Sequence, residues 1–201
     1  MTVVRHLIVE ESSSSVDNGG AGTISYHTLY LPHAIQETDP KCFATDGALL
    51  SDMLARQSSV VAAFKDGPNI LFIQAGQNDL RSADASVWLT DFSDYLAKFQ
   101  DAIKSSGKLV RLGISTHNPR NEIPFNANRA IADPALRLFA SEGKCDFVVD
   151  WAADPKWGPD AAVANQVLYP DGTHPSQAGQ GNMEANYFRP VLNSLSLPLT
   201  Y

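Results

Sequence analysis

Short apolar runs alternate along the chain with amphipathic segments, and this alternation restricts the fold more than any other feature. The clearest apolar run covers 69–75 (Asn-Ile-Leu-Phe-Ile-Gln-Ala), and its composition predicts a buried strand. The clearest amphipathic segment covers 86–106, where apolar side chains recur every three or four residues from Trp88 to Ile103. Strands that alternate with helices form βαβ units, so we expect a parallel sheet covered on both faces.

The remaining elements follow from the same reasoning. We expect further strands at 3–9, 41–44, 108–115 and 146–150, and further helices at 23–36, 48–64, 126–141 and 176–195. The helix at 23–36 should end or bend near Pro32, and Pro134 should interrupt or shift the helix at 126–141. Residues 76–79 should form a loop, and 151–170 a longer one with a helical turn at 160–165.

These elements predict an α/β fold, a flavodoxin-like three-layer α/β/α sandwich with a five-stranded parallel sheet. We expect one domain over 1–201, with strand order 2-1-3-4-5. In that order Cys42 and Cys145 belong to opposite edges of the sheet. A disulfide needs Cα atoms within about 7 Å, and opposite edges lie farther apart, so we expect two thiols and no disulfide.

The charge and the apolar content exclude several classes of protein. The net charge is −7 and no basic run is present, so a nucleic-acid partner is not expected. No apolar stretch approaches the roughly 18 residues of a spanning helix, so no membrane partner is expected. No secretory signal is visible, which fits a cytoplasmic protein or an excised or mature secreted domain. The oligomeric state is left open.

Five polar or glycine residues should gather at one rim of the sheet. Ser12, Gly47 and Asn78 each follow a predicted strand, and Asp171 and His174 follow the last strand by a long loop. In open parallel sheets, ligands bind beyond the carboxyl ends of the strands. The sequence therefore predicts a site at this rim.

The residue types at this rim suit the hydrolysis of an ester. His174 can accept a proton from the Ser12 hydroxyl, and Asp171 can orient the imidazole. The N–H groups of Ser12 and Gly47 and the side-chain amide of Asn78 can bind the oxyanion of the tetrahedral intermediate. We therefore predict a serine esterase that needs no metal and no organic cofactor.

Three short motifs resemble those of the SGNH (GDSL-like) hydrolase family. Residues 76–79 (Gly-Gln-Asn-Asp) look like the G-x-N-D block, and 171–175 (Asp-Gly-Thr-His-Pro) look like the D-x-x-H-P block. Gly47, before a predicted helix, looks like the glycine of the second block. The resemblance covers nearly the whole chain, and it implies the same roles for Ser, Gly, Asn and His. It also implies small ester substrates, including acetyl groups on carbohydrates, lipids and thioesters.

The first block departs from the family pattern. The family reads G-D-S at the end of the first strand, whereas this chain reads Glu10-Glu11-Ser12. A glutamate in place of glycine adds a bulky charged side chain at a tight strand exit, which puts the first oxyanion donor in question. We take Ser12 as the nucleophile and Ser13 as the fallback.

Three aromatic side chains are weaker candidates for substrate contact. His117 follows the fourth predicted strand, and Trp151 and Trp157 flank the start of the loop that leads to Asp171. The tryptophans are placed to stack on a sugar ring or to wall an acyl pocket. A solvated loop histidine and ordinary loop packing explain the three residues equally well.

The substrate class that we favour is an O-acetylated carbohydrate, with a small-molecule or carbohydrate ester as the only partner. A lipase or thioesterase of the same family is an alternative. Two further hypotheses belong to other classes. One is a glycan-binding module on a catalytically dead fold, and the other is a hydrolase whose metal is bound by Asp79, Asp171 and His174.

Overall fold

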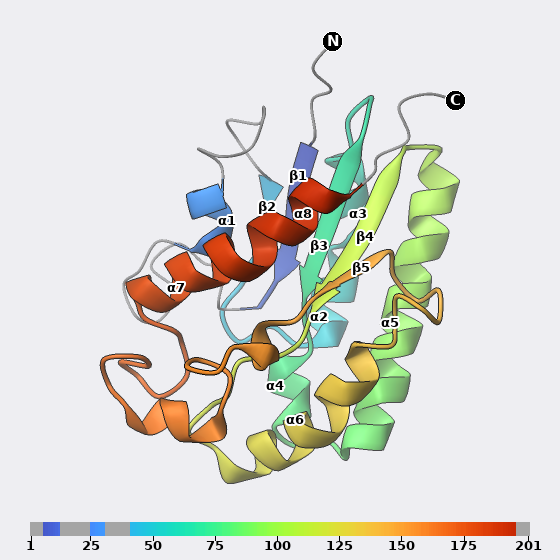
Figure 1. Cartoon of the computed structure of the whole chain (residues 1–201). Helices are drawn as coiled ribbons and strands as arrows, with labels where there is room; N and C mark the ends of the chain where they lie inside the picture. The colour runs from blue at the N-terminus through green and yellow to red at the C-terminus, as the bar shows by residue number, and fades with distance from the viewer. Residues whose placement is uncertain (1–5, 13–24, 31–40, 196–201) are drawn as a thin grey trace.

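The protein is built around a five-stranded parallel sheet (Figure 1). The computed structural model describes residues 6–12, 25–30 and 41–195. The strands lie in the order β2-β1-β3-β4-β5, which confirms the predicted sheet and its order. Their bounds are β1 (His6–Glu11), β2 (Lys41–Cys42), β3 (Asn69–Gln74), β4 (Val110–Ser115) and β5 (Phe147–Val149).

Alternate residues of the strands pack into two separate cores, one on each face of the sheet. Ile8 of β1 and Leu71 of β3 belong to one core. Their neighbours Val9 and Phe72, which are paired across the two strands, belong to the other. Every residue of β3 is buried, because the sheet is covered on both sides.

Helices cover both faces, so the predicted three-layer sandwich is confirmed. Helices α2, α3, α5 and α6 pack against one core, and α1 and the stretch from α7 to α8 pack against the other. Figure 1 shows α7 and α8 crossing the face of the sheet that is turned to the viewer. The helices are α1 (Tyr26–Tyr30), α2 (Leu50–Ala55), α3 (Gln57–Ala62), α4 (Gln77–Leu80), α5 (Ala85–Ser106), α6 (Ile123–Leu136), α7 (Gln177–Met183) and α8 (Arg189–Ser194), with short 3-10 helices η2 (Trp151–Ala153) and η3 (Asp160–Ala164) and a π-helix η4 (Glu184–Phe188).

The amphipathic helix expected at 86–106 is confirmed as α5. Its side chains Trp88, Phe92 and Phe99 are buried in the first core. Gly107 ends the helix in a left-handed conformation, with φ of 66°. The spacing of the apolar residues therefore predicted both the helix and the face that it buries.

The prediction of a single helix at 48–64 is wrong, because α2 and α3 are separated at Arg56. The backbone of Arg56 leaves the helical region, with φ of −100° and ψ of 6°. Its guanidinium instead reaches back to Glu10, at the end of β1, where Nε donates to Oε1 at 2.8 Å. A contact distant in sequence therefore overrides the local helical pattern.

The prediction of a loop at 76–79 is also wrong, because the short helix α4 begins at Gln77. Gly76 takes a left-handed conformation with φ of 78°, and its carbonyl accepts from the Leu80 N–H at 2.9 Å. The same carbonyl accepts from the indole Nε1 of Trp88 at 2.8 Å. A side chain at position 76 would collide with that indole, so both the backbone conformation and the packing require glycine here.

Two predicted helices differ in their bounds. Helix α6 begins and ends earlier than 126–141, since Pro124 is tolerated in its first turn and Pro134 lies inside its last turns. Of the helix expected at 23–36, the described residues contain α1, and Pro32 lies outside the described residues.

Cys42 on β2 and Cys145 before β5 lie at opposite edges of the sheet, and neither is in a disulfide, as predicted. None of the helices formed by residues 6–12, 25–30 and 41–195 has the length and apolar content needed to span a membrane.

Candidate active site

The predicted site residues stand on segments that follow the carboxyl ends of the strands. Ser12 directly follows β1, and Asn78 lies in α4 just after β3. Asp171 and His174 belong to the long connection between β5 and α7. The segment 116–121 after β4 lies between them, and its hydrogen bonds reach both Asn78 and the Asp171 loop. Parallel strands therefore bring these segments to one rim.

Asp171 and His174 form a tightly hydrogen-bonded pair. Oδ2 of Asp171 lies 2.7 Å from Nδ1 of His174, and Oδ1 accepts the backbone N–H groups of Thr173 at 2.9 Å and His174 at 2.7 Å. Burial alone would raise the pKa of the Asp171 carboxyl, but these hydrogen bonds bring it below its ordinary value. An ionised carboxylate on Nδ1 holds the ring so that Nε2 is the nitrogen available for proton transfer.

The side chain of Asn78 is held from two sides. Its Nδ2 donates to the carbonyl of Ala48 at 3.0 Å, and its Oδ1 accepts from Nη1 of Arg120 at 3.1 Å. Because Nδ2 carries two hydrogens, the bond to Ala48 leaves a second one for a ligand. Asn78 is therefore tied to the turn that contains Gly47.

Gly47 presents its backbone to open space. It has φ of 72°, and a Cβ built there would meet no atom of the described residues within 4 Å. Its N–H makes no hydrogen bond to a backbone carbonyl within the described ranges. The positive φ explains why glycine is favoured here, and the open space leaves room for a substrate.

Ser12 is fully buried at the end of β1. Its N–H donates to the Gln74 carbonyl at 3.3 Å, so the sheet uses the donor that the sequence assigned to the oxyanion. Its Oγ has no hydrogen-bond partner among the residues the structure describes, and thus none to His174. The structure therefore pairs Asp171 with His174 but does not join Ser12 to them, and Ser13 lies outside the described residues.

The two glutamates before Ser12 are accommodated by partners inside the protein. Arg56 donates Nε to Glu10 Oε1 at 2.8 Å, Nη2 to the Glu11 carbonyl at 3.1 Å and Nη1 to Thr45 Oγ1 at 2.7 Å. The carboxylate of Glu11 accepts from the Tyr26 hydroxyl at 2.9 Å. The glutamate in the glycine position therefore points inward, and Arg56 links the end of β1 to the turn before Gly47.

Comparisons with known proteins identify the family. The sequence profile of GDSL-like lipases and acylhydrolases matches residues 14–185, which is most of the chain. The chain belongs to the GDSL-like lipase/acylhydrolase family. This GDSL-like hydrolase is accordingly a carboxylic ester hydrolase. The matched range contains Gly47, Asn78, Asp171 and His174 and begins two residues after Ser12.

Solved structures share the fold at low sequence identity. A lipolytic G-D-S-L family protein from Veillonella parvula has a TM-score of 0.70 and 15% identity, over 96% of this chain and 100% of that one. A GDSL-like lipase from Bacteroides thetaiotaomicron has a TM-score of 0.67 and 16% identity, over 95% and 89%. A catalytic mutant of an acetylxylan esterase from Geobacillus stearothermophilus has a TM-score of 0.59 and 19% identity, over 100% of both chains. No curated protein sequence matches the chain.

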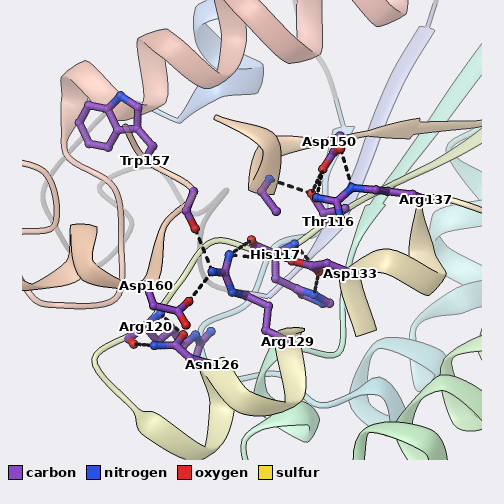
Figure 2. Close-up of polar contacts among 12 residues, drawn as sticks. Thr116, His117, Arg120, Asn126, Arg129, Asp133, Arg137, Asp150, Trp157 and Asp160 are labelled. Carbon is purple, nitrogen blue, oxygen red and sulfur yellow. Dashed lines mark hydrogen bonds and ion pairs between the residues drawn. The ribbon is translucent and has the colours of Figure 1, made fainter. Parts of the chain in front are cut away.

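The three aromatic residues that were weaker candidates are buried in this GDSL-like hydrolase. His117 is 2% exposed, and its Nδ1 lies 2.7 Å from Asp133 Oδ1 (Figure 2). Trp151 packs edge-on against Tyr26, and Trp157 packs against Tyr169. Their burial favours ordinary packing, the alternative that the sequence left open, over contact with a substrate.

A buried arginine that the sequence analysis did not single out holds the loop after β5. Arg129 of α6 donates to the carbonyls of His117 at 2.9 Å and Gly158 at 2.8 Å, and to Asp160 at 2.5 Å (Figure 2). Its partners are two carbonyls and a side chain from distant segments, so local sequence carries no signal for them. Arg129 fastens the loop that leads to Asp171.

Asp79 has a structural partner. Its carboxylate accepts from the backbone N–H of Leu50, at the start of α2, at 3.1 Å. In the part of the chain that the structure describes, no three His, Cys, Asp or Glu side chains gather as a metal-binding group. The set Asp79, Asp171 and His174 therefore does not form the ligand cluster that the metal hypothesis requires.

Proposed function

We propose that this hydrolase cleaves small acyl esters through Ser12, with His174 as the general base and Asp171 as the orienting carboxylate. The observation that carries the proposal is the Asp171–His174 pair, with 2.7 Å between Oδ2 and Nδ1. Its position on a turn at the rim suits a base that must meet a nucleophile from another strand.

In this proposal, Nε2 of His174 takes the proton of the Ser12 hydroxyl as Oγ attacks the ester carbonyl carbon. The Gly47 N–H, the second Nδ2 hydrogen of Asn78 and the Ser12 N–H stabilise the resulting oxyanion. The last of these must give up its long bond to Gln74. His174 then protonates the leaving alcohol, and water attacks the acyl-enzyme in the same way. Each oxyanion donor of this kind is worth about 3 kcal/mol of transition-state stabilisation.

For the substrate we favour an O-acetylated carbohydrate. Support comes from the polar side chains at the rim and from the fold shared with an acetylxylan esterase. Trp151 and Trp157 add no support, since their burial favours ordinary packing. A lipase or thioesterase of the same family is the nearest alternative, and ester chain length separates the two.

A glycan-binding module on an inactive fold is the second candidate, and one observation favours it. The Ser12 hydroxyl is buried and lacks a hydrogen bond to His174 among the described contacts. Such a module would bind acetylated glycans without releasing acetate.

The first test measures hydrolysis of nitrophenyl acetate by the wild type and by Ser12→Ala, Ser13→Ala and His174→Ala. We expect Ser12→Ala and His174→Ala to lose roughly 10³-fold or more in kcat, while Ser13→Ala keeps its rate. Loss in Ser13→Ala alone would move the nucleophile to Ser13.

Acetate release from acetylated xylan, set against nitrophenyl esters of two to eight carbons, then tests the substrate class. Preference for the octanoate would favour the lipase or thioesterase alternative. Binding of acetylated xylan without turnover of any ester would favour the glycan-binding module.

A further inference from the structure

Arg120 is a buried cation whose hydrogen bonds go to neutral groups. It is 3% exposed, and its guanidinium donates Nη1 to Asn78 Oδ1 at 3.1 Å and Nη2 to Gln77 Oε1 at 3.0 Å. Burial lowers the pKa of Arg120 to about 10. Burying a charged group costs desolvation free energy, which is usually offset by a partner of opposite charge. The hydrogen bonds of Arg120 to two neutral amides therefore need a functional or structural explanation.

The contact with Arg120 fixes which way the Asn78 amide points. A guanidinium has donors and no acceptor, so it can face only the oxygen of the amide. On the other side, the Ala48 carbonyl is an acceptor and can face only the nitrogen. The two partners therefore exclude the flipped amide and keep the NH₂ group beside the Gly47 turn.

Arg120 is itself held in place from several directions. Its backbone N–H donates to Asn126 Oδ1 at 3.0 Å, and its carbonyl accepts from Asn126 Nδ2 at 2.7 Å (Figure 2). The guanidinium lies 5.1 Å from the centre of the Phe125 ring, a cation–π contact. A side chain anchored in this way can transmit its position to Asn78.

The neighbouring residue contacts the loop that carries the Asp171–His174 pair. The Asn121 N–H donates to the Gly172 carbonyl at 2.7 Å. Gly172 has φ of 73°, and a Cβ there would approach the Asn121 Cβ to 3.0 Å. Adjacent residues of one segment therefore touch the proposed oxyanion donor and the turn of the proposed base.

We infer that Arg120 is a positioning residue for catalysis, which holds the Asn78 amide in the orientation that binds the oxyanion. This inference rests on the proposed function, since it matters only if Asn78 is an oxyanion donor. Arg120 touches no reacting atom itself. Its loss should therefore lower kcat through Asn78 and leave substrate binding largely intact.

A double-mutant cycle tests this coupling. We would measure kcat and KM on nitrophenyl acetate for the wild type, Arg120→Met, Asn78→Ala and the double variant. Asn78→Ala should lose roughly 10²–10³-fold in kcat. Arg120→Met should lose about 10- to 100-fold in kcat with KM within about two-fold, and less than about two-fold further in the Asn78→Ala background.

Two results would overturn the inference, and they are distinguishable. If Arg120→Met costs the same factor with and without Asn78, or costs nothing, Arg120 does not act through Asn78 and the proposed function is untouched. If Asn78→Ala keeps full kcat while Ser12→Ala and His174→Ala do not, the oxyanion role of Asn78 fails and the inference fails with it.

Two further variants guard against a folding defect. Arg111→Met is the matched control, because Arg111 pairs with Asp146 near the amino end of β4, and it should keep wild-type kcat. Arg120→Lys keeps the buried positive charge, so we expect it to fold even if Arg120→Met does not. It lacks the planar guanidinium that donates to two amide oxygens at once. We expect Arg120→Lys to retain part of the rate with Asn78 present; wild-type kcat in this variant would count against the inference.

Discussion

The carboxyl of Glu10 makes the stability of the protein depend on pH. Burial raises the pKa of Glu10 from its ordinary 4.5 to about 7, although Arg56 opposes the shift. Below pH 4.5 the carboxyl is protonated in both states. As the pH rises from 4.5 to 7, the carboxyl ionises in the unfolded chain while it stays protonated in the folded one, so folding free energy is lost, on the order of 3 kcal/mol in total once the pH has passed 7. Glu10→Gln imitates the protonated form, so its advantage over wild type should grow by that amount between pH 4.5 and pH 8.

Urea unfolding at the two pH values measures this difference. Glu142→Gln, which replaces an exposed glutamate on the surface, is the control for the substitution itself. Equal pH dependence of unfolding in Glu10→Gln and wild type would show that the buried carboxyl does not hold its proton.

At the scale of an element, the long connection after β5 depends on one helix. Arg129 of α6 holds Gly158 and Asp160, while the Tyr169 hydroxyl donates to the Trp157 carbonyl at 2.7 Å. Arg129→Met leaves the buried carbonyls of His117 and Gly158 unpaired, so we expect a loss of about 2–4 kcal/mol in unfolding free energy. It should also cost about ten-fold in kcat, because the loop carries the Asp171–His174 pair.

Thermal unfolding and hydrogen exchange of residues 157–174 measure that effect. Arg137→Met, at the residue that directly follows the same helix, is the matched control, because the ion pair of Arg137 with Asp150 is partly exposed and worth about 0–1 kcal/mol. Faster exchange in the loop should appear in Arg129→Met only. Protection that is unchanged in this variant would mean that other contacts hold the loop.

For the whole molecule, the sheet separates two thiols that differ in access. Cys42 is exposed at one edge, whereas Cys145 is buried near the other, and burial raises the pKa of the Cys145 thiol to about 12. With a disulfide-exchange reagent at neutral pH we expect one fast thiol in the native protein and two in denaturant. Cys42→Ser should remove the fast reaction. Two fast thiols in the native state would mean that the edge near β5 opens.

Local patterns determined the fold class and the Asp171–His174 pair, and the strand order followed from the fold class. The period of apolar residues decides between helix and strand, and parallel connections bring strand ends to one rim. The pair could be predicted because its residues lie three apart on a turn, so their contact needs no distant partner. Helix α5 was predictable for a similar reason, since its apolar residues recur every three or four positions and this spacing alone defines the buried face.

Tertiary structure decided the contacts between residues far apart in the chain. It buried His117, Trp151 and Trp157, broke the helix at Arg56 and turned Glu10 inward. It also placed Arg120 on the Asn78 amide. In each case the partner lies in another segment, and burial and charge pairing there outweigh the local preference. The sequence by itself thus determined which residues reach the rim of the sheet, and the tertiary structure decided which of them face outward.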